Sequence, residues 1–133
     1  MKLSALYQIF LDCQSVTTDS RNCPDGSLFI ALKGESFNGN AFAKLALDSG
    51  CAFAIIDEIQ YAIEGDQRYI LVDDCLQTMQ QLANYHRRQL GTRVIGITGT
   101  NGKTTTKELI SSVLCQAHNV LYTLGNLNNH IGV

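Results

Sequence analysis

The stretch RVIGITGTNGKTTT, residues 93–106, decides the fold that we expect for this chain. It begins as a short apolar run with β-branched residues, continues as a turn rich in glycine, and ends in a lysine followed by threonines. A strand that passes through such a turn into a helix is the layout of a phosphate-binding loop. The turn directs several backbone N–H groups into one concavity, and the helix N-terminus adds partial positive charge. The segment therefore predicts binding of nucleotide phosphates.

The glycine spacing in this stretch departs from the common pattern G-x-x-x-x-G-K-[ST]. That pattern would place its first glycine at position 97, which is Ile97, whereas the glycines stand at Gly96 and Gly99. The alternative interpretation is a strand-to-helix turn whose glycines only relieve backbone strain. We favour the phosphate loop because Gly-Lys-Thr follows a predicted strand and opens a predicted helix, which is the context that the motif requires.

The loop supplies candidate residues for ATP and Mg²⁺. Lys103 can reach the terminal phosphates and is the candidate catalytic residue, and the Thr104 hydroxyl is the candidate ligand of Mg²⁺. Asn101 either contacts phosphate or holds the turn, as asparagine often does. The predicted phosphate-binding set is Gly99, Thr100, Asn101, Gly102, Lys103, Thr104 and Thr105.

Alternating apolar runs and amphipathic segments lie on both sides of this loop. A continuous apolar run such as residues 51–56 predicts a strand covered on both faces. Apolar residues at helical spacing, as over residues 3–11, predict a helix with one buried face. Strands that alternate with helices indicate an α/β chain with largely parallel pairing. We expect strands at 16–18, 27–32, 51–56, 69–72, 93–97 and 120–123, helices at 3–11, 41–49, about 74–90 and 103–118, and irregular segments at 33–40 and 57–67.

The buried faces of two helices follow from their spacing. Either Asp73 or Asp74 can cap the helix that ends before Gly91. We interpret His86 on that helix as a packed or surface residue rather than a functional one. The residues expected to face the core are Phe42, Leu45 and Ala46 on the earlier helix, and Leu76, Met79, Ala83 and Leu90 on the later one.

The order of the predicted elements places a domain boundary near Gly91. Residues 1–90 contain enough strands and helices for a small α/β domain. Residues 91–133 begin with the phosphate loop but supply too few strands to close a sheet. We therefore interpret them as the truncated start of an ATP-binding domain with a P-loop-type parallel sheet, in a longer protein. The other interpretation is that they pack onto the first domain.

Composition narrows the class of protein. The chain has 133 residues, of which 45% are hydrophobic, so it can bury a core. A net charge of −2 argues against a nucleic-acid-binding protein, which usually carries a basic stripe. No apolar run approaches the ~18 residues of a membrane-spanning helix, and the N-terminus does not read as a signal peptide. We expect no nucleic-acid partner and no membrane insertion.

The cysteines point to a reducing compartment. Their number is odd and no two form a C-x-x-C pair, which argues against a disulfide framework or a zinc site. We expect a cytoplasmic protein in which each cysteine acts as a small hydrophobic residue rather than as a nucleophile. The cysteines are Cys13, Cys23, Cys51, Cys75 and Cys115.

Two blocks of this sequence resemble the Mur ligases, the ATP-dependent enzymes that form amide bonds in peptidoglycan precursor synthesis. The loop at residues 96–105 is similar to their variant phosphate loop, which folylpolyglutamate synthetases share. Residues 18–52 are similar to the UDP-binding domain of the members that form the tripeptide and the pentapeptide. This chain has Asn38-Gly39-Asn40 where those members often show Asp-Gly-His.

A third block, residues 123–133, resembles the pattern T-x-G-N-x-N-N-x-x-G-V of the member that adds D-alanyl-D-alanine. The member that adds the third residue tends to carry Thr-Thr-Gly there. The resemblance implies contacts with the UDP-linked substrate, although Arg21 can instead pair with a carboxylate and the later asparagines can instead satisfy loop backbone groups. The implied substrate contacts are Asp19, Ser20, Arg21, Asn38, Asn126 and Asn129.

The resemblance implies a ligase of peptidoglycan synthesis and cell wall biogenesis. Such an enzyme adds D-alanyl-D-alanine to UDP-N-acetylmuramoyl-tripeptide through an acyl phosphate, with ATP and Mg²⁺. We expect a monomer, and we expect this chain to be inactive without the rest of the enzyme. Alternatives are the third-residue-adding ligase, a folylpolyglutamate-type ligase, and a non-catalytic module that binds a UDP-sugar.

Overall fold

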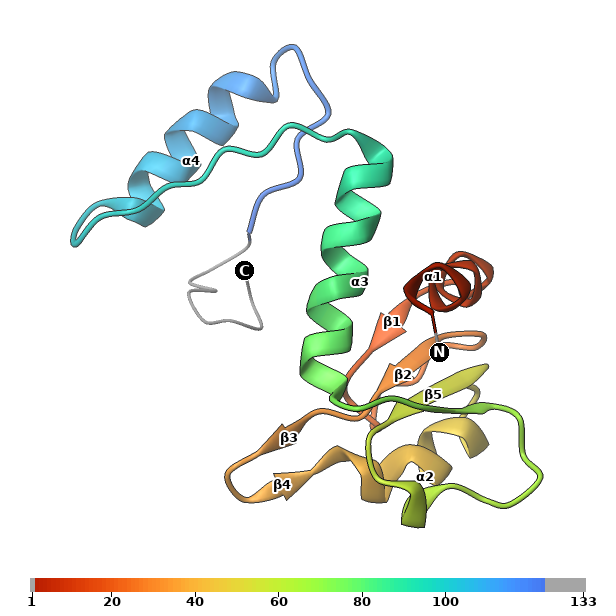
Figure 1. Ribbon diagram of the computed structural model, residues 1–133. Helices are drawn as coiled ribbons and strands as arrows, with labels where there is room; N and C mark the ends of the chain where they lie inside the picture. The colour runs from red at the N-terminus through yellow and green to blue at the C-terminus, as the bar shows by residue number, and fades with distance from the viewer. Residues whose placement is uncertain (1, 124–133) are drawn as a thin grey trace. The chain divides into compact units, whose positions relative to one another are not determined.

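The computed structural model describes residues 2–123. The backbone divides into two compact units, Met1–Gly91 and Thr92–Val133. The first unit is built on a parallel sheet, and the second contributes one described helix (Figure 1). No helix in the described part of the chain is long and apolar enough to cross a membrane.

The sheet of the first unit has four strands in the order β1-β2-β5-β6, and every neighbouring pair is parallel. All three residues of β2 are buried, as are Ala54, Ile55 and Ile56 of β5, because helices cover the sheet. This confirms the predicted α/β class with parallel pairing. The strands are β1 (Val16–Thr17), β2 (Leu28–Ile30), β5 (Phe53–Ile56) and β6 (Tyr69–Leu71).

Three helices complete this unit. Helices α1 and α3 lie together on one face of the sheet, and α2 lies on the other (Figure 1). The core between these layers includes Leu6, Phe29, Ile55 and Leu82. Parallel strands bury both faces in this way because their crossover connections place helices on each side. The helices are α1 (Leu3–Asp12), α2 (Ala43–Asp48) and α3 (Cys75–Leu90).

The segment 33–40, which was predicted as a loop, contains regular secondary structure. It forms a short antiparallel hairpin, β3 (Lys33–Gly34) and β4 (Phe37–Asn38), followed by the 3₁₀ helix η1 (Gly39–Phe42). The Asn38 side chain caps η1 by accepting the Asn40 N–H. A second 3₁₀ helix, η2 (Ile59–Tyr61), interrupts the irregular segment after β5.

Helix α2 therefore begins later than predicted, and a different face is buried. Ala43, Ala46 and Leu47 lie in the core, whereas Leu45 is 50% exposed. Phe42 stacks on Phe37 at 5.3 Å between ring centroids instead of facing the core. The prediction that these residues face the core was right for Ala46 and wrong for Leu45 and Phe42. The two errors arise because the 3₁₀ helix rotates the chain before α2 starts.

Helix α3 has the predicted ends but a different buried stripe. Asp74 is the cap, since its Oδ1 accepts the Gln77 N–H at 2.7 Å, and Gly91 ends the helix at φ 61°. Cys75 and Leu82 are the buried residues, while Leu90 is 62% exposed. The predicted core role was wrong for Leu90 and Ala83, which are exposed, whereas Met79 packs against the core as predicted and Leu76 is partly buried.

In the second unit, α4 (Lys103–Leu114) follows the glycine-rich turn as predicted. The strands expected at 93–97 and 120–123 are not formed within the described residues. Val94 is 64% exposed, Ile95 is 61% exposed and Leu121 is fully exposed. A strand needs a neighbour for its backbone hydrogen bonds, and no described segment pairs with either stretch.

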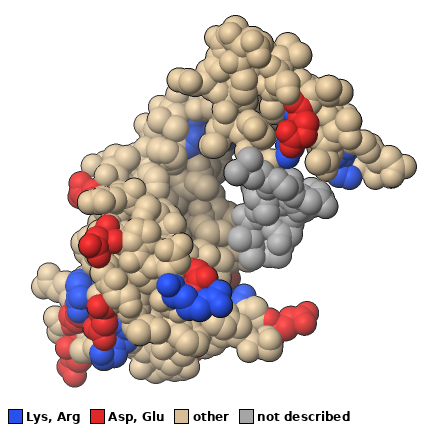
Figure 2. Space-filling view, turned by 180° about the vertical axis from the view of Figure 1, so that it is seen from behind, with Lys and Arg blue, Asp and Glu red and all other residues tan. Residues whose placement is uncertain are grey.

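Charged side chains of both signs lie beside one another on the face seen in Figure 2. Three ion pairs of the first unit join opposite charges: Arg21–Asp19 at 2.8 Å, Lys44–Asp48 at 2.5 Å and Arg68–Asp66 at 2.7 Å. Each pair joins residues close in sequence, so these charges are neutralised locally.

Candidate functional site

The predicted phosphate loop has the backbone geometry of a glycine-dependent turn. Gly99 has φ 142° and Gly102 has φ 76°, values in the left-handed region that side chains with a Cβ rarely adopt. Gly102 is the N-cap of α4, and its carbonyl accepts the Thr106 N–H at 2.8 Å. A Cβ at Gly102 would meet no atom within 4 Å, so the space beside the cap is open.

The start of α4 presents unused donors. The first N–H groups of a helix have no partner inside the helix, and Gly102 provides no side-chain cap for them. Thr104 and Thr105 are exposed in this first turn, beside Thr100 and Asn101 of the preceding loop. Free N–H groups at a helix N-terminus form a site suited to an anion such as a phosphate.

Lys103 lies over this loop. Its Nζ donates a hydrogen bond to the Gly99 carbonyl oxygen at 2.6 Å, across the turn that separates strand-like chain from helix. The ammonium group is thus held beside the backbone amides rather than extended into solvent. A phosphate oxygen in the turn would be a stronger partner for this ammonium than a neutral carbonyl, because both groups would be charged.

The second predicted set of residues follows β1 in the first unit. The Arg21 guanidinium donates two hydrogen bonds to the Asp19 carboxylate, from Nε to Oδ1 at 2.9 Å and from a terminal nitrogen to Oδ2 at 2.8 Å. These hydrogen bonds lower the pKa of Asp19 to about 2. The alternative that Arg21 pairs with a carboxylate is therefore what the structure shows. Among the described residues, no hydrogen bond uses the Ser20 hydroxyl.

Asn38 is held by a local network. Its Oδ1 accepts both the Asn40 N–H at 3.0 Å and the Asn40 Nδ2 at 2.9 Å, and its Nδ2 donates to the Glu58 carboxylate at 3.3 Å. Asn40 is 1% exposed and also donates to Asp57. The Asn-Gly-Asn segment thus uses its amides to hold the end of the β3–β4 hairpin.

Asp57, which the sequence analysis missed, is the centre of this network. Its side chain is 4% exposed and accepts from Asn40 Nδ2 at 2.8 Å, Lys33 Nζ at 3.0 Å and the Cys75 N–H at 3.2 Å. Burial alone would raise the pKa of Asp57, but these donors outweigh it and lower the pKa. The sequence position of Asp57 could have indicated this role, since Asp57 directly follows an apolar strand and so lies at the carboxyl edge of the sheet.

The described residues of the predicted sites fall into two groups, one in each unit. The phosphate loop is contiguous on the second unit, and Asp19, Ser20 and Arg21 share one turn on the first. Asn126 and Asn129 lie outside the described residues.

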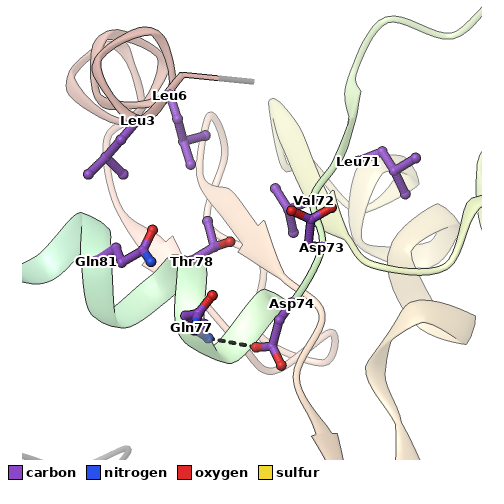
Figure 3. Close-up of a pocket in the computed structure, with 9 residues that line it drawn as sticks. All are labelled: Leu3, Leu6, Leu71, Val72, Asp73, Asp74, Gln77, Thr78 and Gln81. Atoms are coloured by element: carbon purple, nitrogen blue, oxygen red, sulfur yellow. Dashed lines mark hydrogen bonds between the residues drawn. The ribbon is translucent and has the colours of Figure 1, made fainter.

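A separate cavity of about 230 Å³ lies within the first unit, between α1, the end of β6 and α3 (Figure 3). No residue of either predicted set lines it. Asp74, which lines it, is already used as the cap of α3. The lining residues are Leu3, Leu6, Leu71, Val72, Asp73, Asp74, Gln77, Thr78 and Gln81.

Cys13, Cys23, Cys51 and Cys75 are buried or partly buried, as expected of small hydrophobic residues, whereas Cys115 is exposed, so that expectation was wrong for Cys115. All five cysteines are free thiols, and no group of metal-ligating side chains occurs within residues 2–123. His86 Nδ1 is 3.1 Å from the Tyr7 hydroxyl, and the His86 ring packs edge-on against Phe10. His86 therefore packs against α1, and the absence of a functional role for it stays a prediction.

Comparison with known protein families matches almost the whole chain. Residues 12–87 match the model described as "Mur ligase family, catalytic domain". Residues 97–133 match the model described as "Mur ligase middle domain". The first match alone covers more than half of the chain.

Individual relatives agree with this. The chain is 48% identical over 118 residues to the UDP-N-acetylmuramoyl-tripeptide–D-alanyl-D-alanine ligase of Bacillus subtilis (strain 168), covering 89% of this chain and 26% of that protein. It is 40% identical over 119 residues to the ligase of the same name from Escherichia coli (strain K12), covering 90% and 26%. The chain thus spans about a quarter of the length of these relatives.

Solved structures show the same fold. Crystal structure I of MurF from Acinetobacter baumannii aligns with a TM-score of 0.82 at 34% identity, covering 98% of this chain and 31% of that one. MurF ligase from Thermotoga maritima in complex with ADP aligns with a TM-score of 0.81 at 31% identity, covering 92% and 28%. The chain belongs to the Mur ligase family.

Proposed function

We propose that this chain is the N-terminal part of an ATP-dependent ligase that adds D-alanyl-D-alanine to UDP-N-acetylmuramoyl-tripeptide. The observation that carries the proposal is the glycine-lysine loop at the start of α4, in a chain whose relatives carry that ligase name. The reaction phosphorylates the tripeptide carboxylate, and the incoming amine then displaces phosphate to form the amide. We place the ligase in the cytoplasm, as a monomer.

The loop fits the phosphates of ATP. Gly102 leaves open space beside the helix start, the first-turn amides lack a side-chain cap, and Lys103 already reaches across the turn. The proposed phosphate-binding residues are Gly99 to Thr105, with Lys103 neutralising charge on the terminal phosphates. Thr104 would supply a hydroxyl to Mg²⁺, whose chemistry is to neutralise charge on the transferred group.

We assign residues 1–90 to a substrate-binding domain and residues 91–133 to the start of the ATP-binding domain. The proposed contacts with the UDP-linked substrate are Ser20, Asp19, Arg21 and Asn38, joined by Asn126 and Asn129 beyond the described residues. We favour Ser20 among them, since its hydroxyl makes no hydrogen bond to a described residue. Asp19 and Arg21 already bind one another.

The test of this proposal is Lys103→Ala in the complete protein. We expect the transition state of ATP-dependent ligation to lose about 3 kcal/mol of stabilisation or more, because one charge-neutralising group is lost. The rate of ligation is measured as the release of phosphate that depends on D-alanyl-D-alanine. Lys44→Ala is the matched control, since Lys44 is exposed and pairs with Asp48 on α2. Near-normal turnover by Lys103→Ala would refute the loop assignment.

A second candidate is a non-catalytic binding module for a UDP-sugar, since the first unit has a hydrophobic core of its own. The intact mass of the native protein from its source cells separates the two. A mass well above that of this chain supports the ligase. A mass equal to this chain would exclude ligation by this polypeptide alone and favour the module.

A further inference from the structure

The turn after β1 is held by one hydroxyl group. Thr17, the last residue of β1, donates from Oγ1 to the Asn22 carbonyl at 2.9 Å and lies 3.3 Å from the Asp19 carbonyl. The same Oγ1 accepts the Asp19 N–H at 3.2 Å. The Asn22 N–H closes the turn on the Asp19 carbonyl at 3.0 Å. Thr17 therefore binds both ends of the segment that contains Ser20.

Within this turn, the side chains of Asp19 and Arg21 form hydrogen bonds with each other. The Asp19 carboxylate accepts the Arg21 N–H at 3.0 Å in addition to the guanidinium bonds. The Ser20 hydroxyl has no hydrogen bond to any described residue. The turn thus leaves one polar side chain, between two that are occupied, available to a ligand.

We propose that Thr17 is a positioning residue for the UDP-linked substrate, acting through Ser20. This inference rests on the proposed function, because it assumes that the turn contacts that substrate. Thr17 ends β1 at the carboxyl edge of a parallel sheet, the edge at which α/β proteins commonly bind ligands. With the Thr17 hydroxyl in place, the turn has its shape before substrate arrives, so binding costs less conformational entropy.

Cys23 also contacts the backbone of this turn. Its Sγ donates toward the Ser20 carbonyl at 3.5 Å and the Asp19 carbonyl at 3.8 Å. Burial raises the pKa of Cys23 to about 11, so the thiol keeps its proton near neutral pH and remains a donor. Thr17 and Cys23 therefore both hold backbone groups of the turn that contains Ser20.

The experiment compares Thr17→Val and Thr17→Ser in the complete protein, by initial rates with each substrate varied in turn. Valine keeps the shape of threonine and favours a strand, but it removes the hydroxyl. We expect Thr17→Val to raise KM for the UDP-linked substrate at least about fivefold, the equivalent of one lost hydrogen bond, with KM for ATP unchanged. Thr17→Ser restores the hydroxyl and should return KM to near the wild-type value.

Two further variants make the result specific. Thr78→Val makes the same substitution on α3, at a residue whose hydroxyl makes no hydrogen bond to the described residues of the turn, and should leave both KM values unchanged. Cys23→Ala should shift KM for the UDP-linked substrate in the same direction by a smaller factor, and it tests the turn independently if Thr17→Val fails to fold. Equal KM values in Thr17→Val, Cys23→Ala and wild type would overturn the positioning role.

The outcomes separate this inference from the proposed function. Ligation by the wild type with no effect of either turn variant rejects the role of Thr17 and keeps the ligase. A wild-type protein that neither ligates nor binds the UDP-linked substrate rejects both. A rise in both KM values, with Thr17→Ser failing to rescue, would mean general damage to the fold and would also reject the positioning role.

Discussion

Asp57 joins three elements of the first unit through one buried carboxylate. It accepts donors from the β3 residue Lys33, from Asn40 in η1 and from the first residue of α3. Asp57→Asn would replace two acceptor oxygens by one, so that an amide donor faces other donors. We expect a loss of about 1–3 kcal/mol in the free energy of unfolding at neutral pH, measured by urea denaturation.

The same carboxylate gives the sign of a pH effect. Because the pKa of Asp57 is lowered in the folded state, its stabilisation is present above the ordinary aspartate pKa of about 3.9 and is lost as pH falls through the lower folded pKa. The difference in unfolding free energy between wild type and Asp57→Asn should therefore shrink below about pH 4. Asp12→Asn, at an exposed carboxylate, is the control and should change stability by less than about 0.5 kcal/mol. A difference that stays constant down to low pH would contradict this account.

Residue identities were easier to predict than residue partners. The sequence singled out Asp19, Ser20 and Arg21, but it left open whether Arg21 would meet substrate or a carboxylate. The structure shows the carboxylate two positions away. Asp57 was passed over because its role depends on Lys33 and Asn40, which reach it only after the hairpin folds back. A pattern along the chain does not contain such contacts.

At the level of elements, apolar periodicity predicted those that pack within the first unit. It placed β2, β5, β6, α1 and α3 close to where they lie. It failed at the hairpin and at η1, because polar and small residues there are ordered by side-chain bonds, such as Asn38 to the Asn40 N–H, rather than by an apolar pattern. It also predicted strands in the second unit, where the β-branched run has no partner among the described residues.

The start of α3 provides a test at this scale, since the sequence left Asp73 and Asp74 as equal candidates for its cap. Only Asp74 accepts the Gln77 N–H. Asp74→Ala should cost about 1 kcal/mol of unfolding free energy, because one first-turn amide loses its partner. Asp73→Ala is the matched control and should cost much less. Chemical denaturation of both variants measures the difference, and equal losses would show that the cap is not what stabilises this helix end.

At the scale of the whole molecule, the location of the buried apolar residues decides how stable each unit is. Every buried apolar side chain among the described residues belongs to the first unit, whereas the one buried residue described in the second is Ser111. An isolated helix as short as α4 is marginal in water, since most helical stability in proteins comes from packing an apolar face. Leu109 and Val113 of α4 are exposed, so that face is not buried within the described residues.

Amide hydrogen exchange on the 133-residue chain tests this difference. We expect the amides of β2, β5 and α3 to be protected by the full unfolding free energy of the first unit, because exchange there requires the core to open. The amides of α4 should exchange far faster, as in a fraying helix. In the complete ligase that we propose, further strands would cover the apolar face of α4, and its amides should become as protected as those of β5. If α4 in this chain already exchanged as slowly as β5, the first unit would not hold the only stable core, and assigning α4 to an incomplete ATP-binding domain would be wrong.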